Sequence, residues 1–271
     1  MTFLSTSSQH DRLRVVLVST RNPLNIGAAA RAMSNFGFRH LRVVSPYELA
    51  FREARSAVGA SELLATAEEF SSVADAVADC SLVIGTTAAR NREVRHPLRP
   101  LDEGARLISK RLAAGRVALL FGSEKRGLSN SDFSHCHWLM HIPTNPGQMS
   151  MNLGQAVAVC LYELARGHKK AKAKATLQKR NARSLQNKAT KPIELSGPAS
   201  AGQLERMTAI LSDVLSTSGY LGAQQSAAAS SKDKLRRQVR RLDLSAADAE
   251  VWIGMLRQIA WKMHSGEKLE K

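Results

Sequence analysis

The chain has 271 residues, of which 44% are hydrophobic, and it carries a formal net charge of +16 at pH 7. This apolar content is enough for a buried core and excludes a chain that is disordered throughout. The excess of Lys and Arg indicates a polyanionic partner and favours nucleic acid over an anionic membrane surface.

Short β-branched runs alternate with helix-like segments in the first part of the chain, up to residue 167. Strands are predicted at residues 14–19, 41–44, 81–84, 117–121 and 138–142, and an Ala-rich helix at residues 24–36. Strands that alternate with helices at this spacing are typical of a mostly parallel α/β sheet. We therefore expect residues 1–167 to form one α/β domain.

The charge pattern changes after this domain. Ten Lys and Arg residues and no Asp or Glu lie between residues 166 and 191, and such a run cannot form a core of its own. We interpret residues 168–200 as a solvated basic linker that is helical only in part. A simple solubilising tether is the alternative interpretation of the same run.

Residues 201–271, which follow the linker, are expected to form a small helical region. Helices are predicted at residues 201–215, 232–241 and 246–263. The last of them starts with Ser245-x-x-Asp248, a pattern typical of a capping box. Five of its apolar residues fall on one face, where we expect a core or a partner: Trp252, Met255, Leu256, Ile259 and Met263.

Signals of several common protein classes are missing from the sequence. There is no GxGxxG motif after the first predicted strand, and no GxxxxGK[ST] or GxSxG motif, which disfavours a dinucleotide enzyme or a P-loop ATPase. The eight His residues form no metal-ligand cluster, so no metal site is expected. No apolar run reaches the roughly 20 residues of a membrane span, and the three Cys form no CxxC pair. We expect a soluble, reduced protein of the cytoplasm.

Three polar segments follow predicted strands or lead into predicted helices: residues 20–33, 121–128 and 142–154. In an open α/β sheet, ligands bind beyond the carboxyl ends of the strands, so these segments are expected to form one site. Taken singly, each segment has an ordinary explanation. Asn25 or Ser150 then caps a helix, and Gly122 forms a turn.

Together, the segments resemble the three motifs of the SPOUT-class RNA ribose 2′-O-methyltransferases. The matching residues are Asn25-Ile-Gly-x-x-x-Arg31, Phe-Gly-x-Glu124-x-x-Gly127-Leu, and Ile142-Pro followed by Ser150-Met-Asn152-Leu. The order and spacing match across the predicted α/β domain. The linker and C-terminal helices, through Asp233-Lys-Leu-Arg-Arg and the capped last helix, resemble the subgroup that methylates nucleotide 32 in the tRNA anticodon loop.

The resemblance implies a trefoil knot at the carboxyl end of the sheet and a site for S-adenosylmethionine inside it. The positions that match the family's cofactor site are Thr86, Thr87, Ala88, Gly122, Ile142, Met149, Ser150 and Met151. Without a side chain, Gly122 lets the backbone approach a ligand closely. Four apolar residues are expected to line an adenine pocket: Leu119, Leu120, Ile142 and Leu153.

The implied reaction transfers a methyl group to a ribose 2′-hydroxyl, which must lose its proton as it attacks. The resemblance makes Arg31 the residue that contacts this hydroxyl and its neighbouring phosphate. Because guanidinium groups stay protonated in proteins, we expect Arg31 to clamp the phosphate and stabilise the developing alkoxide. Asn25 is expected to position Arg31 or the ribose. Glu124 is expected to orient these groups or balance the sulfonium charge, unless it pairs with Lys125 or Arg126.

Ser150 is expected to hold a phosphate or the cofactor carboxylate, and Asn152 to fix the loop around it. Members of this family act as dimers with the site near the interface, so the resemblance implies a homodimer that binds tRNA. Two alternatives remain. One is a ribosomal RNA 2′-O-methyltransferase, and the other is a catalytically silent RNA-binding protein with the same fold.

Overall fold

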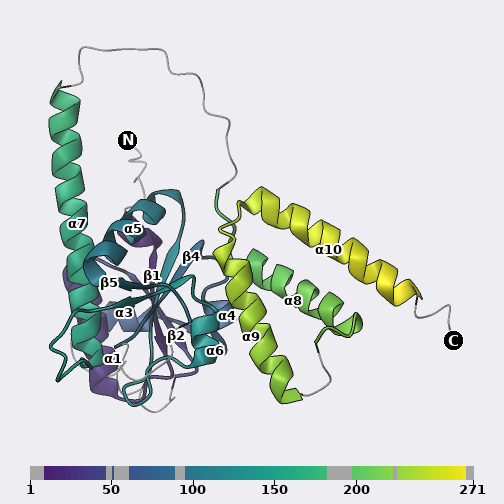
Figure 1. Ribbon diagram of the computed structural model, residues 1–271. Helices are drawn as coiled ribbons and strands as arrows, with labels where there is room; N and C mark the ends of the chain where they lie inside the picture. Colours follow the sequence, from purple (N-terminus) through teal and green to yellow (C-terminus); the bar gives the residue numbers. More distant parts are fainter. Residues whose placement is uncertain are drawn as a thin grey trace.

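The computed structural model describes residues 9–46, 51, 61–88, 95–181, 197–221 and 225–266. Its centre is a seven-stranded sheet in which every pairing is parallel (Figure 1). The strands are β1 (Leu13–Val18), β2 (His40–Val44), β3 (Glu68–Phe70), β4 (Leu82–Thr86), β5 (Leu98–Pro100), β6 (Val117–Phe121) and β7 (Trp138–His141). Their spatial order is β3-β2-β1-β6-β4-β7-β5. The predicted α/β class and parallel sheet are confirmed, whereas the trefoil knot stays a prediction.

The central strands β1 and β6 are buried along their whole length, as expected of a sheet covered on both faces. The apolar run of β6, and that of β1 after Arg14, made both strands predictable. The outer strands β3 and β5 were not predicted, because each has only three residues and β3 begins with Glu68 and Glu69. Such short, polar strands carry no periodic signal.

Helices cover both faces of the sheet (Figure 1). The helices of the α/β part are α1 (Pro23–Phe36), α3 (Ser61–Ala65), α4 (Val73–Ala76), α5 (Leu101–Ala114), α6 (Asn130–Ser134) and α7 (Leu153–Asn181), after a short 3₁₀ turn at Gln9–Arg12. Helices α1, α3, α5 and α7 pack into the larger apolar core on one face. Helices α4 and α6 pack into a smaller core on the other face. Within the described part of the chain, no helix is long and apolar enough to cross a membrane.

Helix α7 runs well past the predicted end of the α/β domain. It continues to Asn181, so residues 168–181 of the expected linker prolong a helix whose first half lies in the core. The Ala and Lys residues of this stretch have a high helix propensity, which favours continuation of the helix. Residues 182–196 of the expected linker lie outside the described residues.

The C-terminal region consists of three helices, α8 (Ala201–Thr217), α9 (Gln225–Arg241) and α10 (Ala246–Gly266), as predicted. They share a small core that includes Leu204, Val239 and Ile253. The predicted cap of α10 is confirmed, because the Ser245 hydroxyl accepts a hydrogen bond from the Asp248 backbone N–H at 3.1 Å.

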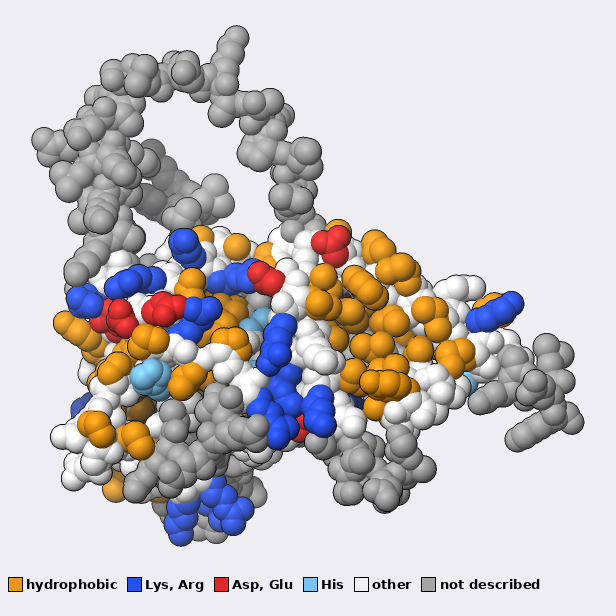
Figure 2. Space-filling view, viewed as in Figure 1, with side chains coloured by type: hydrophobic (Ala, Val, Ile, Leu, Met, Phe, Trp, Pro, Cys, Tyr) orange, Lys and Arg blue, Asp and Glu red, His pale blue; other side chains and the backbone are white. Residues whose placement is uncertain are grey.

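The predicted apolar face of α10 is mostly solvent-exposed. Of its residues, Leu256 is buried, whereas Trp252, Met255 and Ile259 keep 42%, 47% and 46% of their surface exposed. The large apolar area over the C-terminal helices is visible in Figure 2. This face is therefore better described as a surface for a partner than as part of a core.

The C-terminal helices dock directly on the α/β part. At the start of α8, the Ala201 N–H donates to the Cys80 carbonyl at 2.7 Å and the Gly202 N–H to the Ala78 carbonyl at 2.9 Å. Each bond satisfies a donor that a helix N-terminus otherwise leaves unpaired. Ala201 itself is buried in the smaller core, on the face of the sheet that α4 and α6 cover.

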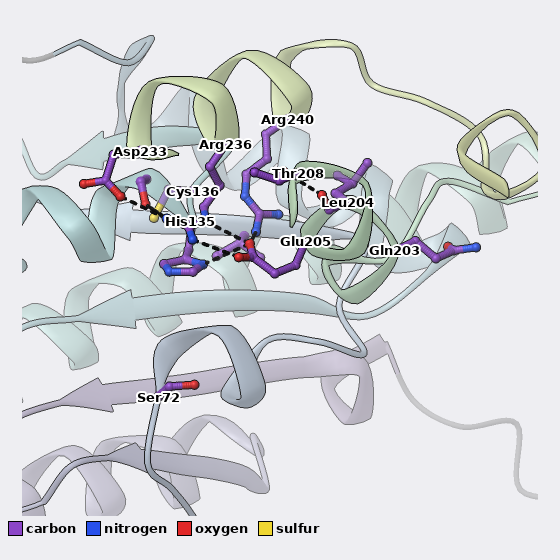
Figure 3. Close-up of polar contacts among 12 residues, drawn as sticks. Ser72, His135, Cys136, Gln203, Leu204, Glu205, Thr208, Asp233, Arg236 and Arg240 are labelled. Carbon is purple, nitrogen blue, oxygen red and sulfur yellow. Dashed lines mark hydrogen bonds and ion pairs between the residues drawn. The ribbon is translucent and has the colours of Figure 1, made fainter. Parts of the chain in front are cut away.

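Two arginines of α9 form a polar cluster at this junction (Figure 3). Arg236 makes a bidentate pair with Glu205 of α8 at 2.8 Å, and its Nη1 also donates to Ser134 of α6 at 2.8 Å. Arg240 is 2% exposed and lies 3.5 Å from the same carboxylate. Burial lowers the pKa of Arg236, but Glu205 and Asp233 outweigh this effect and raise it. Burial also lowers the pKa of Arg240, to about 10.

The substitution Arg236→Gln is expected to lower the free energy of unfolding by about 3 kcal/mol. It leaves the largely buried carboxylate of Glu205 without its main partner. Thermal and urea unfolding measure this change. Arg206→Gln is the matched control, since the Arg206–Glu250 pair is about half exposed on both sides and is worth less than about 1 kcal/mol. Equal losses for both variants would contradict a junction held by Arg236.

Candidate active site

A cavity of about 330 Å³ opens beyond the carboxyl ends of β4, β6 and β7. Its size falls within the range of small-molecule sites. All eight positions expected to bind a cofactor line it: Thr86, Thr87, Ala88, Gly122, Ile142, Met149, Ser150 and Met151. Two of the three segments singled out in the sequence, residues 121–128 and 142–154, therefore meet at this cavity, whereas no residue of segment 20–33 lines it.

The apolar lining differs in part from the expectation. Ile142 and Leu153 line the cavity as predicted. Leu119 and Leu120 do not, because successive residues of β6 point into the two helix-covered cores on opposite faces of the sheet. Phe133 and Cys160 line it instead, and as apolar residues of α6 and α7 they gave no signal that distinguished them from core.

Gly122 is required for a reason other than the one expected. A Cβ at this position would lie 2.0 Å from the Gly127 carbonyl carbon and 2.1 Å from the Leu128 nitrogen. The close approach is thus between two parts of the same loop, which closes where the Gly127 N–H donates to the Ser123 carbonyl at 2.8 Å. Gly127 has a φ of +64°, a conformation that glycine adopts without strain.

Glu124 connects this loop to the start of α1. Its carboxylate accepts hydrogen bonds from the backbone N–H groups of Arg21 and Asn22, at 3.3 and 3.2 Å, and from the Asn25 side-chain amide at 3.1 Å. The alternative of a salt bridge between Glu124 and a neighbouring basic residue is therefore wrong. The carboxylate instead lies at the N-terminus of α1, where unpaired backbone N–H groups stabilise an anion.

These hydrogen bonds set the ionisation of Glu124. Burial raises the pKa of its carboxyl, but the bonds from Asn25 and from the backbone stabilise the charged form and hold the pKa below its ordinary value of 4.5. Because the pKa is lower in the folded state than in the unfolded state, the contribution of Glu124 to stability is present above pH 4.5. It is lost as the pH falls through the folded-state pKa.

Comparing wild type with Glu124→Gln tests this pH dependence. The variant is expected to have a lower Tm at pH 7, and the difference is expected to shrink as the pH falls below 4.5, the ordinary pKa. Thermal melts between neutral and acid pH measure the difference. Glu62→Gln, at an exposed carboxylate of α3, serves as the control and should show no such trend. A difference in Tm that stays constant with pH would contradict the argument.

Asn152 extends the network to α7. Its amide donates to the Asn25 side-chain oxygen at 2.8 Å, and its own oxygen accepts from the Gly154 N–H at 2.9 Å. Asn152 is thus the N-cap of α7, and neither Ser150 nor Asn25 caps a helix. Asn22 caps α1 instead, through a 2.9 Å bond from the Leu24 N–H.

The loop that follows β7 contains an internal hydrogen bond that was not predicted from the sequence. The Thr144 hydroxyl donates to the Met149 carbonyl at 3.3 Å, which fixes the part of the loop that carries Met149 and Ser150 over the cavity. Thr144 also lines the cavity. The Ile-Pro-Thr-Asn-Pro run was the available signal, because a hydroxyl residue between two prolines commonly bonds back to its own loop.

Ser150 lines the cavity without joining this network, and Arg31 does neither. It is exposed on α1, lies outside the cavity lining, and makes no hydrogen bond or ion pair with any residue that the structure describes. Six positions separate it from Asn25, which places the two side chains on different faces of the helix. Arg31 instead shares an exposed stripe of α1 with Leu24 and Ala28.

The described residues hold no group of three or more His, Cys, Asp or Glu side chains that is placed to bind a metal ion. The three cysteines are free and buried. Burial raises the pKa of the Cys160 thiol to about 12, so this thiol at the cavity wall stays protonated and is a poor nucleophile.

Comparisons with known proteins agree with this geometry. The profile of the SpoU rRNA Methylase family matches residues 12–162. The tRNA (cytidine/uridine/adenosine-2′-O-)-methyltransferase TrmJ of Pseudomonas aeruginosa is 36% identical over 249 residues, covering 91% of this chain and 93% of that protein. The tRNA (cytidine/uridine-2′-O-)-methyltransferase TrmJ of Yersinia pestis is 33% identical and covers 91% of both. The crystal structure of TrmJ from Z. mobilis ZM4 superposes with a TM-score of 0.73 at 30% identity, over 91% of this chain and 98% of that one. The chain belongs to the SpoU rRNA Methylase family, and it is a methyltransferase.

Proposed function

We propose that the protein transfers a methyl group from S-adenosylmethionine to the ribose 2′-hydroxyl of tRNA, at nucleotide 32 of the anticodon loop, in the cytoplasm. The observation that carries the proposal is the convergence of the loops that follow β4, β6 and β7 on one cavity, beside which the Asn25 side chain bonds to both Glu124 and Asn152. Similarity to proteins named TrmJ over 91% of the chain, C-terminal helices included, supports tRNA as the substrate.

The cavity suits this cofactor. Ile142, Leu153 and Phe133 offer an apolar surface for adenine, while hydroxyls and backbone groups of the three loops offer polar partners. Glu124 also lines the cavity, and its negative charge complements a sulfonium. S-adenosylmethionine, when bound, supplies an electrophilic methyl group for an oxygen nucleophile.

The chain's own residues then have to hold the ribose and handle its proton. The Ser150 hydroxyl, exposed at the cavity, holds a phosphate or the cofactor carboxylate. Arg31 clamps the phosphate next to the target ribose and stabilises the negative charge that develops on the attacking oxygen. A guanidinium is fully protonated at neutral pH, so the hydroxyl proton passes to phosphate or water.

A homodimer brings Arg31 to a cavity. Helices α1 and α7 pack side by side and leave an exposed apolar face formed by Leu24, Val159 and Tyr162, which are 80%, 36% and 54% exposed. Arg31 lies on the same stripe of α1 as Leu24. A second copy seated on this face covers the apolar side chains and places its own Arg31 beside the cavity of the first.

The experiment that tests the function is methyl transfer from labelled S-adenosylmethionine to unmodified tRNA transcripts, followed by mapping of the modified nucleotide. A methylated ribose at nucleotide 32 is the expected result. Transfer to ribosomal RNA alone would keep the chemistry and replace the substrate, which is the alternative that the family's description favours. Tight tRNA binding without transfer to any RNA would favour a silent binding protein.

A further inference from the structure

Helix α9 carries two adjacent pairs of arginines that face in different directions. Arg236 and Arg240 are buried, with 7% and 2% of their surface exposed, and point toward α8 and α6 (Figure 3). Arg237 and Arg241 lie one position further along the helix and are partly or fully exposed. Because positions four apart lie on one face of a helix, the two pairs form separate stripes.

The inward pair is already engaged by the protein. Glu205 accepts hydrogen bonds from Arg236 and forms an ion pair with Arg240 at 3.5 Å, and Asp233 and Ser134 also accept from Arg236. These acceptors hold α9 in a fixed position on the α/β part. The inward arginines are therefore structural and leave no accessible charge for a ligand.

The outward pair meets Arg95 and His96 from the α/β part, of which Arg95 carries a positive charge at neutral pH and His96 does not. Arg241 donates to the Arg95 carbonyl at 2.6 Å. Burial lowers the pKa of Arg237, and Arg95 and Arg241 lower it further, although the nearby Asp233 opposes them. Burial lowers the pKa of His96 to about 4, with further contributions from Arg237 and Arg241. Among the described residues, Arg237 has no hydrogen bond or ion pair of its own. We name these four residues, Arg95, His96, Arg237 and Arg241, the basic seam.

The basic seam borders the candidate active site. The His96 ring lies 6.3 Å from the ring of Phe133, and Phe133 lines the cavity. A column of Lys and Arg side chains crosses the middle of the molecule in Figure 2, between the α/β part and the apolar area of the C-terminal helices. Like charges gathered from two parts of the chain repel one another unless an anion lies between them.

We propose that the basic seam binds phosphates of the RNA backbone next to the nucleotide that enters the cavity. The inference rests on the proposed function and adds to it the surface that holds the substrate. Arg237 and Arg241 are one helical turn, about 6 Å, apart along α9, and they offer planar donors that suit phosphate oxygens. Since Arg236 and Arg240 fix α9, the seam stays at a constant distance from the cavity.

The test compares two double variants of equal charge. Arg237→Gln/Arg241→Gln removes the outward pair of the seam, and Arg257→Gln/Lys262→Gln removes two exposed charges from α10. Affinity for unmodified tRNA is measured by filter binding over a range of KCl concentrations. The seam variant is expected to bind at least about tenfold more weakly, and its log–log salt slope to fall by about 1.5, since each phosphate contact contributes about 0.7–0.9.

The control variant is expected to stay within about twofold of wild type in affinity, with less than half the change in salt slope. Arg95→Gln, on the other side of the seam, is expected to lower the slope by about 0.7–0.9. Both seam variants should keep the wild-type affinity for S-adenosylmethionine, because none of these side chains lines the cavity.

Three outcomes would overturn the proposal. Equal losses in the seam and control variants would indicate a general charge effect, and unchanged tRNA binding would remove the seam from the RNA interface. If the seam variant lost binding to phosphatidylglycerol vesicles that wild type shows, while its tRNA binding stayed intact, the seam would belong to a membrane-binding surface. The binding measurement needs no methyl transfer, so a wild type that binds tRNA through the seam but methylates no RNA would contradict the proposed function and leave the seam in place.

Discussion

Arg31→Ala is expected to lower kcat for tRNA methylation by at least about 100-fold, the loss typical of removing one charged group that stabilises a developing oxyanion. The Tm and the affinity for S-adenosylmethionine should not change, because Arg31 is exposed and bonds to no described residue. Single-turnover methyl transfer, thermal melts and cofactor titration measure these three quantities. Arg39→Ala, at an exposed arginine just after α1, is the control and should retain full activity.

The pH dependence of the same reaction separates two roles for Arg31. A clamp that stays protonated gives a rate with no Arg31-dependent titration near neutral pH. A titration that occurs in wild type and disappears in Arg31→Ala would make Arg31 a general base instead. If Arg31→Ala keeps more than about a tenth of the wild-type kcat, Arg31 has no place in the reaction.

Mixed dimers test whether Arg31 serves the partner's cavity. Ala88→Trp fills the cavity at an exposed lining position and should abolish cofactor binding while leaving the fold intact. Mixing this variant with Arg31→Ala is expected to restore about a quarter of the wild-type activity, since half of the dimers then hold one complete site. No recovery in the mixture would mean that Arg31 acts within its own chain or that no such dimer forms.

Gly122→Ala is the second substitution with a large expected effect. Its Cβ would overlap the backbone of residues 127 and 128 at about 2 Å, and backbone atoms cannot move aside as a flexible side chain does. We expect a loss of about 3 kcal/mol or more in the free energy of unfolding. Affinity for S-adenosylmethionine should be lost with it, because the displaced loop forms one wall of the cavity.

Gly27→Ala provides the contrast for Gly122. A Cβ at Gly27 meets no atom within 4 Å, and alanine in a helix interior is about 0.5–1 kcal/mol more stable than glycine. Urea unfolding and cofactor titration of both variants measure the effects. A Gly122→Ala protein with wild-type stability and cofactor affinity would show that the loop closes differently from the arrangement described here.

The two substitutions address different parts of the proposed site. Gly122 shapes the cavity of its own chain, whereas Arg31 projects from α1 into the region that a second copy would cover. The network of Glu124, Asn25 and Asn152 lies between them and fixes the start of α1 against the loops that follow β6 and β7. The position of Arg31 relative to any cavity therefore depends on this network, even though Arg31 does not contact it.

Local sequence patterns determined the central strands and the polar segments at their ends, whereas the cofactor positions that line the cavity came from the resemblance to a family. The buried strand β6 is a continuous apolar run and β1 is apolar apart from Arg14. Polar segments at strand ends converge because parallel strands end at one edge of the sheet. The short strands β3 and β5 lack such a pattern, because pairing with β2 and β7 rather than their own sequence defines them. Leu119 and Leu120 were expected to line the cavity and do not, because the pleat of β6 directs their side chains into the two cores on opposite faces of the sheet.

The side-chain partners were decided by tertiary structure alone. Glu124 lies next to two basic residues in the sequence, yet it bonds to Asn25, 99 positions away, because the fold brings the N-terminus of α1 to it. The arginines of α9 are alike in sequence, and only docking on α8 and α6 makes Arg236 a buried anchor and Arg237 an exposed cation. A sequence specifies what each residue prefers locally, whereas long-range packing determines which partner is within reach.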